Sequence, residues 1–561
     1  MPSELANCSW SGDRDSGWIP GSHNITRPGA QACEQSLFYG GVTMSPTNWD
    51  DWFHLVQALV QHAVDRYGLP EIRDEWAFEV WNEMWGMSFP DPYMTLFNHS
   101  SAAIKSVDAK IRVGGPATMQ LNYVTDFVAA CEKMNIAYDF VSTHMYPNDG
   151  MCPSNDDGKN VRGQGWNADC FPMLVKAAKA SLPPGKPLYL TEYSVGCCGE
   201  NAAPNSAAMI FRAVGALHDT VEVMSYWTFS MIFEENSEPA DELQGSFGLL
   251  SKNGVPKPGW AAFQLLHAHA GSTVLPTVSD PAWDSGAADT SKCTMKPLGC
   301  FTDQAPDPAC CHPHPQPSSQ GCGNHACKMS SFAHFNAGPK FNTPAGCMHH
   351  CASAGWDVFG LTQDECRCGM AATWQDKSAG CVLNTAANCT GPCPGGQSGG
   401  SATCGTQWNL RMFEMDCKDL TTAPEVVAFA TMNASDSSGV STVSVSVFLS
   451  YWAEVQDGNT AKKVELKVQL GNGGALGGAG VPMSGQAVLY RIDPDHGNAA
   501  KMWSGPMKSV STPTVTQLAE LQKAAQPSSE TLAVSIDHGS GLASITVDSM
   551  PPNSAYVVTL Q

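Results

Sequence analysis

The sequence has 561 residues, of which 43% are hydrophobic and 15% charged, and its length predicts roughly two to four domains. The low charge and the 16 tryptophans exclude a mostly disordered chain. The 31 basic and 53 acidic residues give a net charge of −22, which excludes nucleic acid as the expected partner because a negative protein repels phosphate backbones. No apolar run reaches the length of about 18 residues that indicates a membrane-spanning helix.

The first half of the chain predicts an α/β fold. A helix is expected after residue 46, with Ser45 as its N-cap, Pro46 in its first turn and Gly68 at its end. Apolar strand-like runs then alternate with helix-like stretches, a pattern typical of a parallel sheet with right-handed crossovers. The strands are predicted at residues 76–81, 111–115, 138–143, 187–192 and 221–229, and the helices near 92–106, 121–134, 171–181 and 204–218.

Both an α/β barrel and a doubly wound sheet have this alternation. No G-x-G-x-x-G opens a helix, so the strongest sign of a dinucleotide fold is absent. After Gly271 the alternation stops, and 15 of the 22 cysteines lie between Cys293 and Cys417. From residue 426 onward, seven short runs with period two predict a β-sandwich. The predicted division is therefore 1–275 for the α/β domain, 276–292 with 418–561 for the sandwich, and 293–417 for a Cys-rich insertion.

The cysteine density is typical of a disulfide-bonded extracellular module. Five N-x-S/T sequons also favour a secreted glycoprotein, and they begin at Asn7, Asn24, Asn98, Asn388 and Asn433. The first residues, MPSELANCSW, have neither a basic n-region nor an apolar h-region. We therefore expect a secreted protein, and either its export is unconventional or its true N-terminus, with a signal peptide, is missing from this chain.

Polar residues follow the predicted strands where a barrel places its active site. Two of them are glutamates on different strands, Glu83 and Glu192. Two converging carboxylates suit glycoside hydrolysis, in which one acts as acid and base and the other as nucleophile. Spacing alone leaves open that each is merely paired with an Arg or Lys. The other candidates near these strand ends are Asn82, His144, Tyr146, Trp227, Glu234 and Glu235.

The run FEVWNE followed by LTEY resembles glycoside hydrolase family 39, which contains β-xylosidases and α-L-iduronidases. The segments HAVDRYG, IKSVDAKIRVGGPA, YDFVSTHMY and SYWTFSMIFEE are similar to the family in order and spacing. The tail beginning YRIDPDHGNAAKMW resembles its accessory β-sandwich. The resemblance implies a TIM barrel and a retaining exo-glycosidase without a cofactor, acting on an oligosaccharide or polysaccharide. It favours a β-xylosidase, with an α-L-iduronidase as the alternative.

The resemblance also assigns roles. Glu83 matches the acid/base, Glu192 the nucleophile and Asn82 the amide that binds the sugar 2-hydroxyl. His144, Tyr146 and Trp227 match pocket residues, and Glu234 and Glu235 match a glutamate pair near the sugar. Retention implies carboxyl groups about 5–5.5 Å apart. Two positions depart from the family pattern, which has Pro where this chain has Met84 and Asp where it has Met231.

In this family the acid/base ends the fourth strand of the barrel and the nucleophile ends the seventh. The chain is therefore expected to lack roughly the first three of eight strands and to hydrolyse little substrate in this form. The alternative from another class is a non-catalytic carbohydrate-binding or wall-associated protein.

The Cys-rich segment resembles the WSC domain, a candidate carbohydrate-binding module, and this implies a possible cell-wall glycan partner. LGCFTD matches its opening, and the eight matching cysteines are Cys300, Cys347, Cys351, Cys366, Cys368, Cys389, Cys393 and Cys404. No metal is expected, because one residue between Cys366 and Cys368 is not zinc-ribbon spacing.

Overall fold

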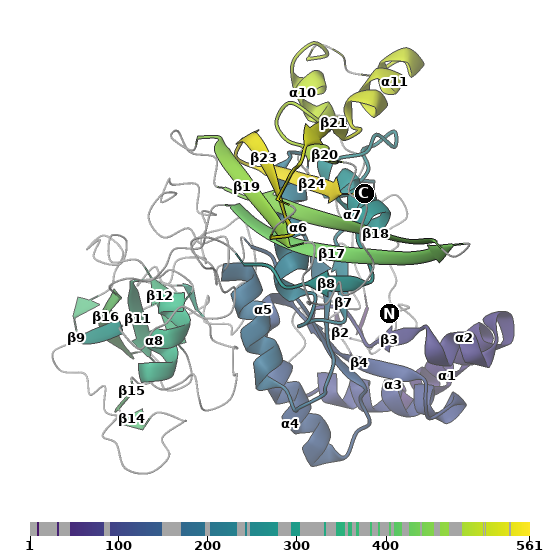
Figure 1. The fold of residues 1–561 in the computed structure, drawn as a ribbon. Coiled ribbons are helices and arrows are strands. Elements are labelled where there is room, and N and C mark those ends of the chain that lie inside the picture. Colours follow the sequence, from purple (N-terminus) through teal and green to yellow (C-terminus); the bar gives the residue numbers. More distant parts are fainter. Residues whose placement is uncertain are drawn as a thin grey trace.

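The computed structural model describes an α/β part, a β-sandwich and a separate sheet formed by the Cys-rich segment (Figure 1). The described residues are 8–9, 31–32, 45–83, 90–147, 170–196, 202–232, 242–243, 247–278, 293–302, 330–331, 344–353, 357–361, 366–369, 382–383, 391–392, 403–404, 409–417, 426–437, 440–453, 460–469, 485–508, 510, 512–537 and 540–560.

The α/β part contains a sheet of five parallel strands in the order β3-β4-β5-β6-β7. These strands are β3 (Ala77–Glu79), β4 (Arg112–Thr118), β5 (Phe140–His144), β6 (Leu188–Tyr193) and β7 (Val223–Tyr226). Spatial order equals chain order, as in a barrel and unlike a doubly wound sheet. All five predicted strands are confirmed, and the sheet is consistent with part of a TIM barrel.

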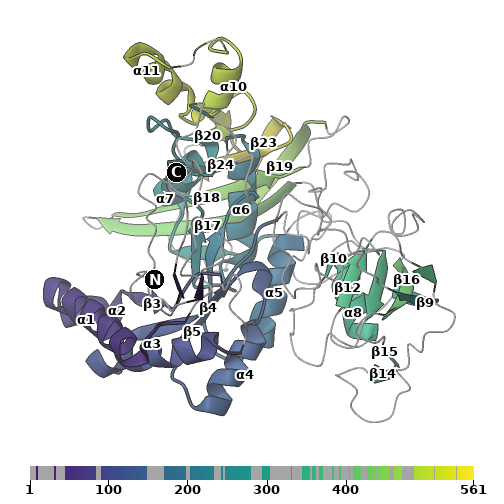
Figure 2. The same cartoon turned by 180° about the vertical axis from the view of Figure 1, so that it is seen from behind.

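Helices connect the strands and cover the outer face of the sheet (Figure 2). They are α1 (Trp49–Tyr67), α2 (Leu69–Asp74), α3 (Tyr93–Val107), α4 (Val124–Met134), α5 (Cys170–Ser181), α6 (Asn205–Leu217) and α7 (Pro258–His269), with a 3-10 turn at Met119–Leu121. The four helices predicted between strands are confirmed. The predicted N-cap of α1 is wrong, because the side chain of Asn48 accepts hydrogen bonds from the backbone of Asp50 and Asp51. Gly68 ends this helix as predicted, with φ of 92°.

Two sheets follow in the C-terminal part. A six-stranded sheet has the order β21-β20-β24-β18-β17-β8, and a three-stranded sheet has the order β19-β23-β22. One hydrophobic core lies between them, with Leu449 and Val558 from the first sheet and Ile545 from the second. The strands are β8 (Thr273–Leu275), β17 (Val426–Ser437), β18 (Val440–Tyr451), β19 (Lys462–Gln469), β20 (Gln486–Ile492), β21 (Ser528–Ala533), β22 (Ser535–Asp537), β23 (Leu542–Met550) and β24 (Ser554–Leu560). Two helices, α10 (Ala499–Ser504) and α11 (Val515–Ala524), lie at its far end (Figure 1).

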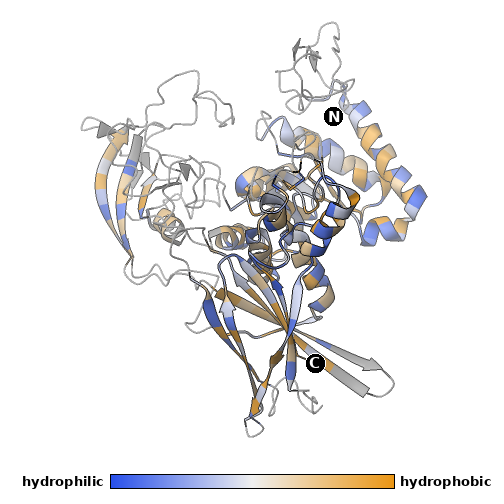
Figure 3. Ribbon diagram, turned by 90° about the horizontal axis from the view of Figure 1, so that it is seen from above, coloured by the Kyte–Doolittle hydropathy of each residue, from blue (hydrophilic) through white to orange (hydrophobic). Residues whose placement is uncertain are grey.

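The sandwich packs directly against the α/β part. Phe211 of α6 contacts Phe448 of β18, and their ring centroids are 5.4 Å apart. Ser450 of β18 donates a hydrogen bond to the carbonyl of Ala208 at 2.7 Å. Figure 3 shows hydrophobic and hydrophilic residues alternating along many of the sandwich strands, as expected for strands with one buried face. Helices α6 and α7 therefore pack against both the parallel sheet and the sandwich.

The Cys-rich segment is inserted between two paired strands of the sandwich. β8 precedes it and β17 follows it, and they pair antiparallel with Leu275 opposite Ala430. Residues 273–275, which the sequence division places in the α/β domain, thus lie in the sandwich sheet. The other domain boundaries remain a prediction.

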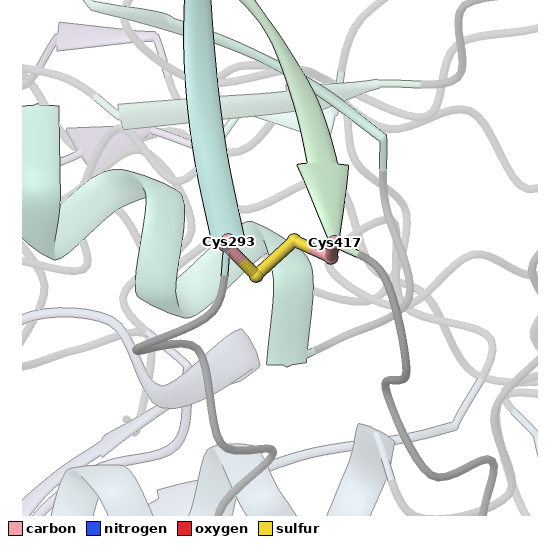
Figure 4. Close-up of a disulfide and its surroundings, with 2 residues drawn as sticks. All are labelled: Cys293 and Cys417. Carbon is pink, nitrogen blue, oxygen red and sulfur yellow. A yellow bond between two sulfur atoms is a disulfide. The ribbon is translucent and has the colours of Figure 1, made fainter.

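The insertion begins and ends at one point. β9 (Cys293–Thr302) pairs antiparallel with β16 (Asn409–Cys417), and a disulfide joins Cys293 to Cys417 where they start and finish (Figure 4). Inside it lie the helix α8 (Pro344–Ser353) and the strands β10 (Ser330–Ser331), β11 (Val358–Leu361), β12 (Cys366–Gly369), β13 (Val382–Leu383), β14 (Gly391–Pro392) and β15 (Thr403–Cys404). Two short strands near the N-terminus are β1 (Cys8–Ser9) and β2 (Gln31–Ala32).

Candidate active site

The carboxyl ends of the parallel strands bring four of the predicted site residues together. Glu83 follows β3, His144 ends β5, Tyr146 lies two residues beyond it, and Glu192 lies near the end of β6. Their chain positions span more than a hundred residues, yet one oxygen of each glutamate and one nitrogen of His144 all lie within 4.8 Å of one another. This is the edge of a parallel sheet at which ligands and catalytic groups are expected.

The backbone around Glu83 is held in an uncommon conformation. Trp81 and Glu83 have φ of 76° and 31°, in the left-handed region that residues other than glycine rarely adopt. The N–H of Glu83 donates to the carbonyl of Ala117 in β4 at 2.8 Å, so hydrogen bonding between the two chain segments continues beyond the last residue of β3. Such conformations cost on the order of 1–3 kcal/mol each and occur frequently at functional sites.

His144 lies between the two glutamates. Its Nδ1 is 2.8 Å from Oε1 of Glu83 and 3.3 Å from Oε2 of Glu192. The hydroxyl of Tyr146 donates to the same Glu192 oxygen at 2.8 Å. The side chains of His144, Glu83 and Glu192 are only 1%, 13% and 11% exposed. The described residues that contact these two glutamates thus include His144 and Tyr146.

The charges of the site favour protonated His144. Burial lowers the pKa of its imidazole, but the hydrogen bond with Glu83 and the negative charges of Glu192, Glu83 and Glu79 outweigh burial and raise the pKa above its ordinary value. A protonated Nδ1 donates to Glu83, and the imidazolium offsets the repulsion between the two carboxylates. The arrangement therefore stabilises two glutamates close together in a largely buried site.

The remaining predicted residues are less closely gathered. The Asn82 side chain is exposed beside Glu83. Trp227 is half-buried directly after β7, and its N–H donates to the carbonyl of Tyr193 at 2.8 Å. Glu234 and Glu235 lie outside the described residues, as does Met84. Met231, the other departure from the family pattern, is fully buried.

One polar pair near the site was not predicted from the sequence. Thr191 Oγ1 donates to Oε1 of Glu79, a residue of β3, at 2.7 Å. The available signal was a glutamate in the middle of an otherwise apolar strand run, since charged residues are rarely placed in buried strands without a partner.

The donor types of Glu83, His144 and Glu192 are also those of a metal site. A metal ion bound there would require Nδ1 of His144 to carry no proton, whereas this nitrogen is hydrogen-bonded to Oε1 of Glu83 at 2.8 Å. The hydrogen bonds among the three residues therefore fit a proton-transfer site better than a metal site.

The α/β part of the chain also matches known proteins. Residues 24–292 match the family model described as glycosyl hydrolases family 39. This part of the chain is therefore related to that family.

Two curated relatives are β-xylosidases. The one from Caldicellulosiruptor saccharolyticus is 32% identical over 247 residues, which cover 42% of this chain and 50% of the relative. The one from Geobacillus stearothermophilus is 33% identical over 251 residues, covering 42% and 49%. The chain thus spans about half the length of the curated relatives it matches.

Solved structures show the same fold at lower identity. A monomeric β-xylosidase from Caulobacter crescentus CB15 aligns with a TM-score of 0.51 at 22% identity, covering 92% of this chain and 75% of the other. A family 39 enzyme from Xanthomonas axonopodis pv. citri aligns with a TM-score of 0.50 at 19% identity, covering 92% and 74%. None of the helices in the described part of the chain combines the length and apolar character that a bilayer span requires.

Proposed function

We propose that the protein is a retaining exo-glycosidase of the β-xylosidase type. The observation that carries this proposal is the close approach of the two glutamates, since one carboxylate oxygen of Glu83 lies within 4.8 Å of one carboxylate oxygen of Glu192. Retaining glycosidases have carboxyl groups about 5–5.5 Å apart, whereas inverting ones need about 6.5–9.5 Å to admit a water molecule. The family match of residues 24–292 and the two β-xylosidase relatives support the same reaction class.

In the first step, Glu83 carries a proton on Oε2, the oxygen that does not accept from His144, and donates it to the glycosidic oxygen while Glu192 attacks the anomeric carbon. The bond to the leaving group breaks, and a covalent glycosyl ester of Glu192 forms. The hydroxyl of Tyr146 and the protonated His144 both face Glu192, so they stabilise its negative charge before the attack. Asn82 and Trp227 are proposed to contact the sugar.

In the second step, the Glu83 carboxylate takes a proton from water, and that water attacks the anomeric carbon. The ester bond breaks, the sugar leaves with its original anomeric configuration, and Glu192 is again a carboxylate. His144 forms a hydrogen bond with Glu83 and lies 3.3 Å from Glu192, so it contacts both the acid/base and the nucleophile.

The test is covalent trapping of the nucleophile. A 2-deoxy-2-fluoro aryl β-xyloside is incubated with the 561-residue chain and with a form extended upstream by about three βα units. Mass spectrometry should find one glycosyl group on the peptide that contains Glu192, and Glu192→Gln should remove it. Glu132→Gln, at an exposed position of α4, is the matched control and should leave labelling intact. Absence of labelling in both forms, or labelling that survives Glu192→Gln, overturns the proposal; labelling by an aryl iduronide analogue alone would identify the other sugar.

We further propose that additional strands cover the free edge of β3. Among the described residues, β3 pairs with β4 alone, and apolar side chains around this edge are exposed. Trp76, directly before β3, is 36% exposed, and Tyr67 of α1, whose ring lies 5.3 Å from that of Trp76, is 51% exposed. An uncovered apolar edge invites aggregation. The extended form should therefore be more soluble and more active than the 561-residue chain; equal turnover by both forms would contradict this.

We also propose that the protein is secreted and that residues 293–417 bind a cell-wall glycan. The disulfide between Cys293 and Cys417 fits an oxidising compartment, and the sequon residues Asn98 and Asn433 are exposed. The other three sequon asparagines lie outside the described residues. Pull-down on insoluble wall glycans should retain the whole chain and lose a form without residues 294–416. Equal retention of both forms would exclude glycan binding by this segment.

A further inference from the structure

A hydrogen bond between Glu79 and Thr191 crosses the inner face of the sheet. The two residues lie on β3 and β6, which are separated in the sheet by β4 and β5. In a flat sheet, three strand spacings amount to about 14 Å, further than a glutamate and a threonine side chain can span. Their 2.7 Å hydrogen bond therefore requires the sheet to be strongly curved.

A glycine on β4, one of the two strands between β3 and β6, leaves room for this contact. Gly114 of β4 is the register partner of Glu79 on one side and of Phe140 on the other. A Cβ at Gly114 would lie 2.4 Å from the carbonyl oxygen of Phe140 and 2.5 Å from its ring. The Phe140 ring itself stacks on Tyr189 of β6 at a centroid distance of 4.3 Å. Glycine at this position thus allows the strands to approach closely where the hydrogen bond crosses them.

Both members of the pair are connected to the candidate catalytic residues through the chain. Thr191 immediately precedes Glu192, and Glu79 lies four residues before Glu83 on the same strand run. Between Thr143 and His144 the pairing with β6 shifts register, so that Leu190 and Glu192 are the partners and Thr191 is skipped. This irregularity leaves Thr191 outside the regular pairing, and its hydroxyl bonds to Glu79.

We propose that Glu79 and Thr191 form a positioning pair that sets the separation of Glu83 and Glu192. The inference rests on the proposed function, because it assigns the pair a part in keeping the two carboxylates at the distance that retention needs. Removing the hydrogen bond lets β3 move relative to β6, and the carboxylates move apart. The Thr191 hydroxyl and the Glu79 carboxylate bond to each other, so we expect the effect to fall on kcat rather than on KM.

The first experiment compares Thr191→Val with Thr191→Ser in whichever form hydrolyses an aryl β-xyloside. Thr191→Val keeps the size of the side chain and removes its hydroxyl, and we expect kcat to fall about 10- to 100-fold with KM nearly unchanged. Thr191→Ser restores the donor and should recover most of the rate. Ser101→Ala, which removes a hydroxyl bonded to the carbonyl of Ala137 at 2.6 Å, is the matched control and should leave kcat unchanged. An unchanged kcat in Thr191→Val overturns the proposal.

The second experiment does not depend on turnover. His144 contacts both glutamates, so its NMR titration reports how closely they are held. Thr191→Val should shift that titration to lower pH, toward the value measured in Glu83→Gln, and Thr191→Ser should shift it back. An unchanged titration in Thr191→Val contradicts the positioning pair even if no hydrolysis is found. A shifted titration together with absent labelling of Glu192 would instead support the pair and overturn only the glycosidase.

Discussion

In the α/β part, β4, β5 and β6 bury almost all their residues, and no covalent link joins strands far apart in sequence among those described. In the inserted segment, Cys293 and Cys417 join the first and last residues of a strand pair 124 positions apart. The region that contains the candidate site is thus stabilised by the burial of apolar side chains. A disulfide closes the region that is inserted into the sandwich.

The difference shows how an insertion of this size is accommodated. The strands on either side of the insertion, β8 and β17, pair with each other, and the insertion enters and leaves at one disulfide. The sandwich sheet is therefore continuous across the insertion point. We expect perturbations of the apolar core and of the disulfide to have separable effects.

The largest effect is expected from Phe448→Ala. Phe448 is fully buried, stacks on Phe429 at a centroid distance of 4.7 Å and contacts Phe211 of α6. Truncating such a ring costs about 3–5 kcal/mol. Denaturant unfolding should show this loss for the α/β part and the sandwich in one transition. A loss confined to the sandwich would contradict the shared core.

A smaller effect is expected from the double variant Cys293→Ser/Cys417→Ser. Removing one disulfide that closes a long loop costs about 2–4 kcal/mol. Residues 293–417 should become sensitive to limited proteolysis, whereas the rest of the chain keeps its melting temperature. Simultaneous proteolysis of the sandwich would show that its sheet depends on the closed insertion.

The candidate site should make the stability of the α/β part depend on pH. The pKa of His144 is raised in the folded protein, so its contribution is fully present below about pH 6.5, the ordinary value, and is lost as pH rises through the folded pKa. Urea unfolding of the chain and of His144→Gln should differ by about 1–2 kcal/mol at pH 6 and by less at pH 9. The disulfide-closed segment should not show this dependence. If the difference in unfolding free energy between the chain and His144→Gln grew with pH, it would contradict a raised pKa of His144 in the folded protein.

The smallest effect is expected from Asn48→Ala, which removes the N-cap of α1. The Asn48 side chain accepts from the N–H of Asp50 at 2.9 Å at an exposed helix end. Such a cap contributes about 1 kcal/mol. The melting temperature should fall slightly, and neither proteolysis of the insertion nor the His144 titration should change. Asn48→Asp keeps an acceptor and should restore stability.

Much of the fold was predictable, because the spacing of apolar residues indicates the helices and strands, and their order along the chain indicates a parallel sheet. The five strands and four connecting helices follow from strand-like runs such as residues 138–143, in which Tyr138, Phe140 and Val141 are apolar, alternating with helix-like stretches. The first N-cap was predicted wrongly, because Ser45 and Asn48 are both good caps and only the backbone of residues 45–48 decides between them. The edge strand β8 was also missed, since three residues are too few for a period.

The site was predictable in its members and less so in its geometry. Glu83, His144, Tyr146 and Glu192 follow strand ends, so their approach could be expected from a barrel. The hydrogen bond between His144 and Glu83 could not, because the position of Glu83 depends on the left-handed backbone at Trp81 and Glu83. The link from Glu79 to Thr191 depends on sheet curvature, which no local pattern in the sequence encodes.

Helix α6 belongs to two cores at once, and this has a consequence for how the molecule opens. Eleven of its thirteen residues are buried, including the polar Asn205, Ser206 and Arg212. A helix covered on all sides has no face along which it can detach while its neighbours stay folded. Its amide hydrogens should therefore exchange with solvent deuterium only when the α/β part and the sandwich unfold together, which makes α6 the slowest-exchanging helix and the reporter of global opening.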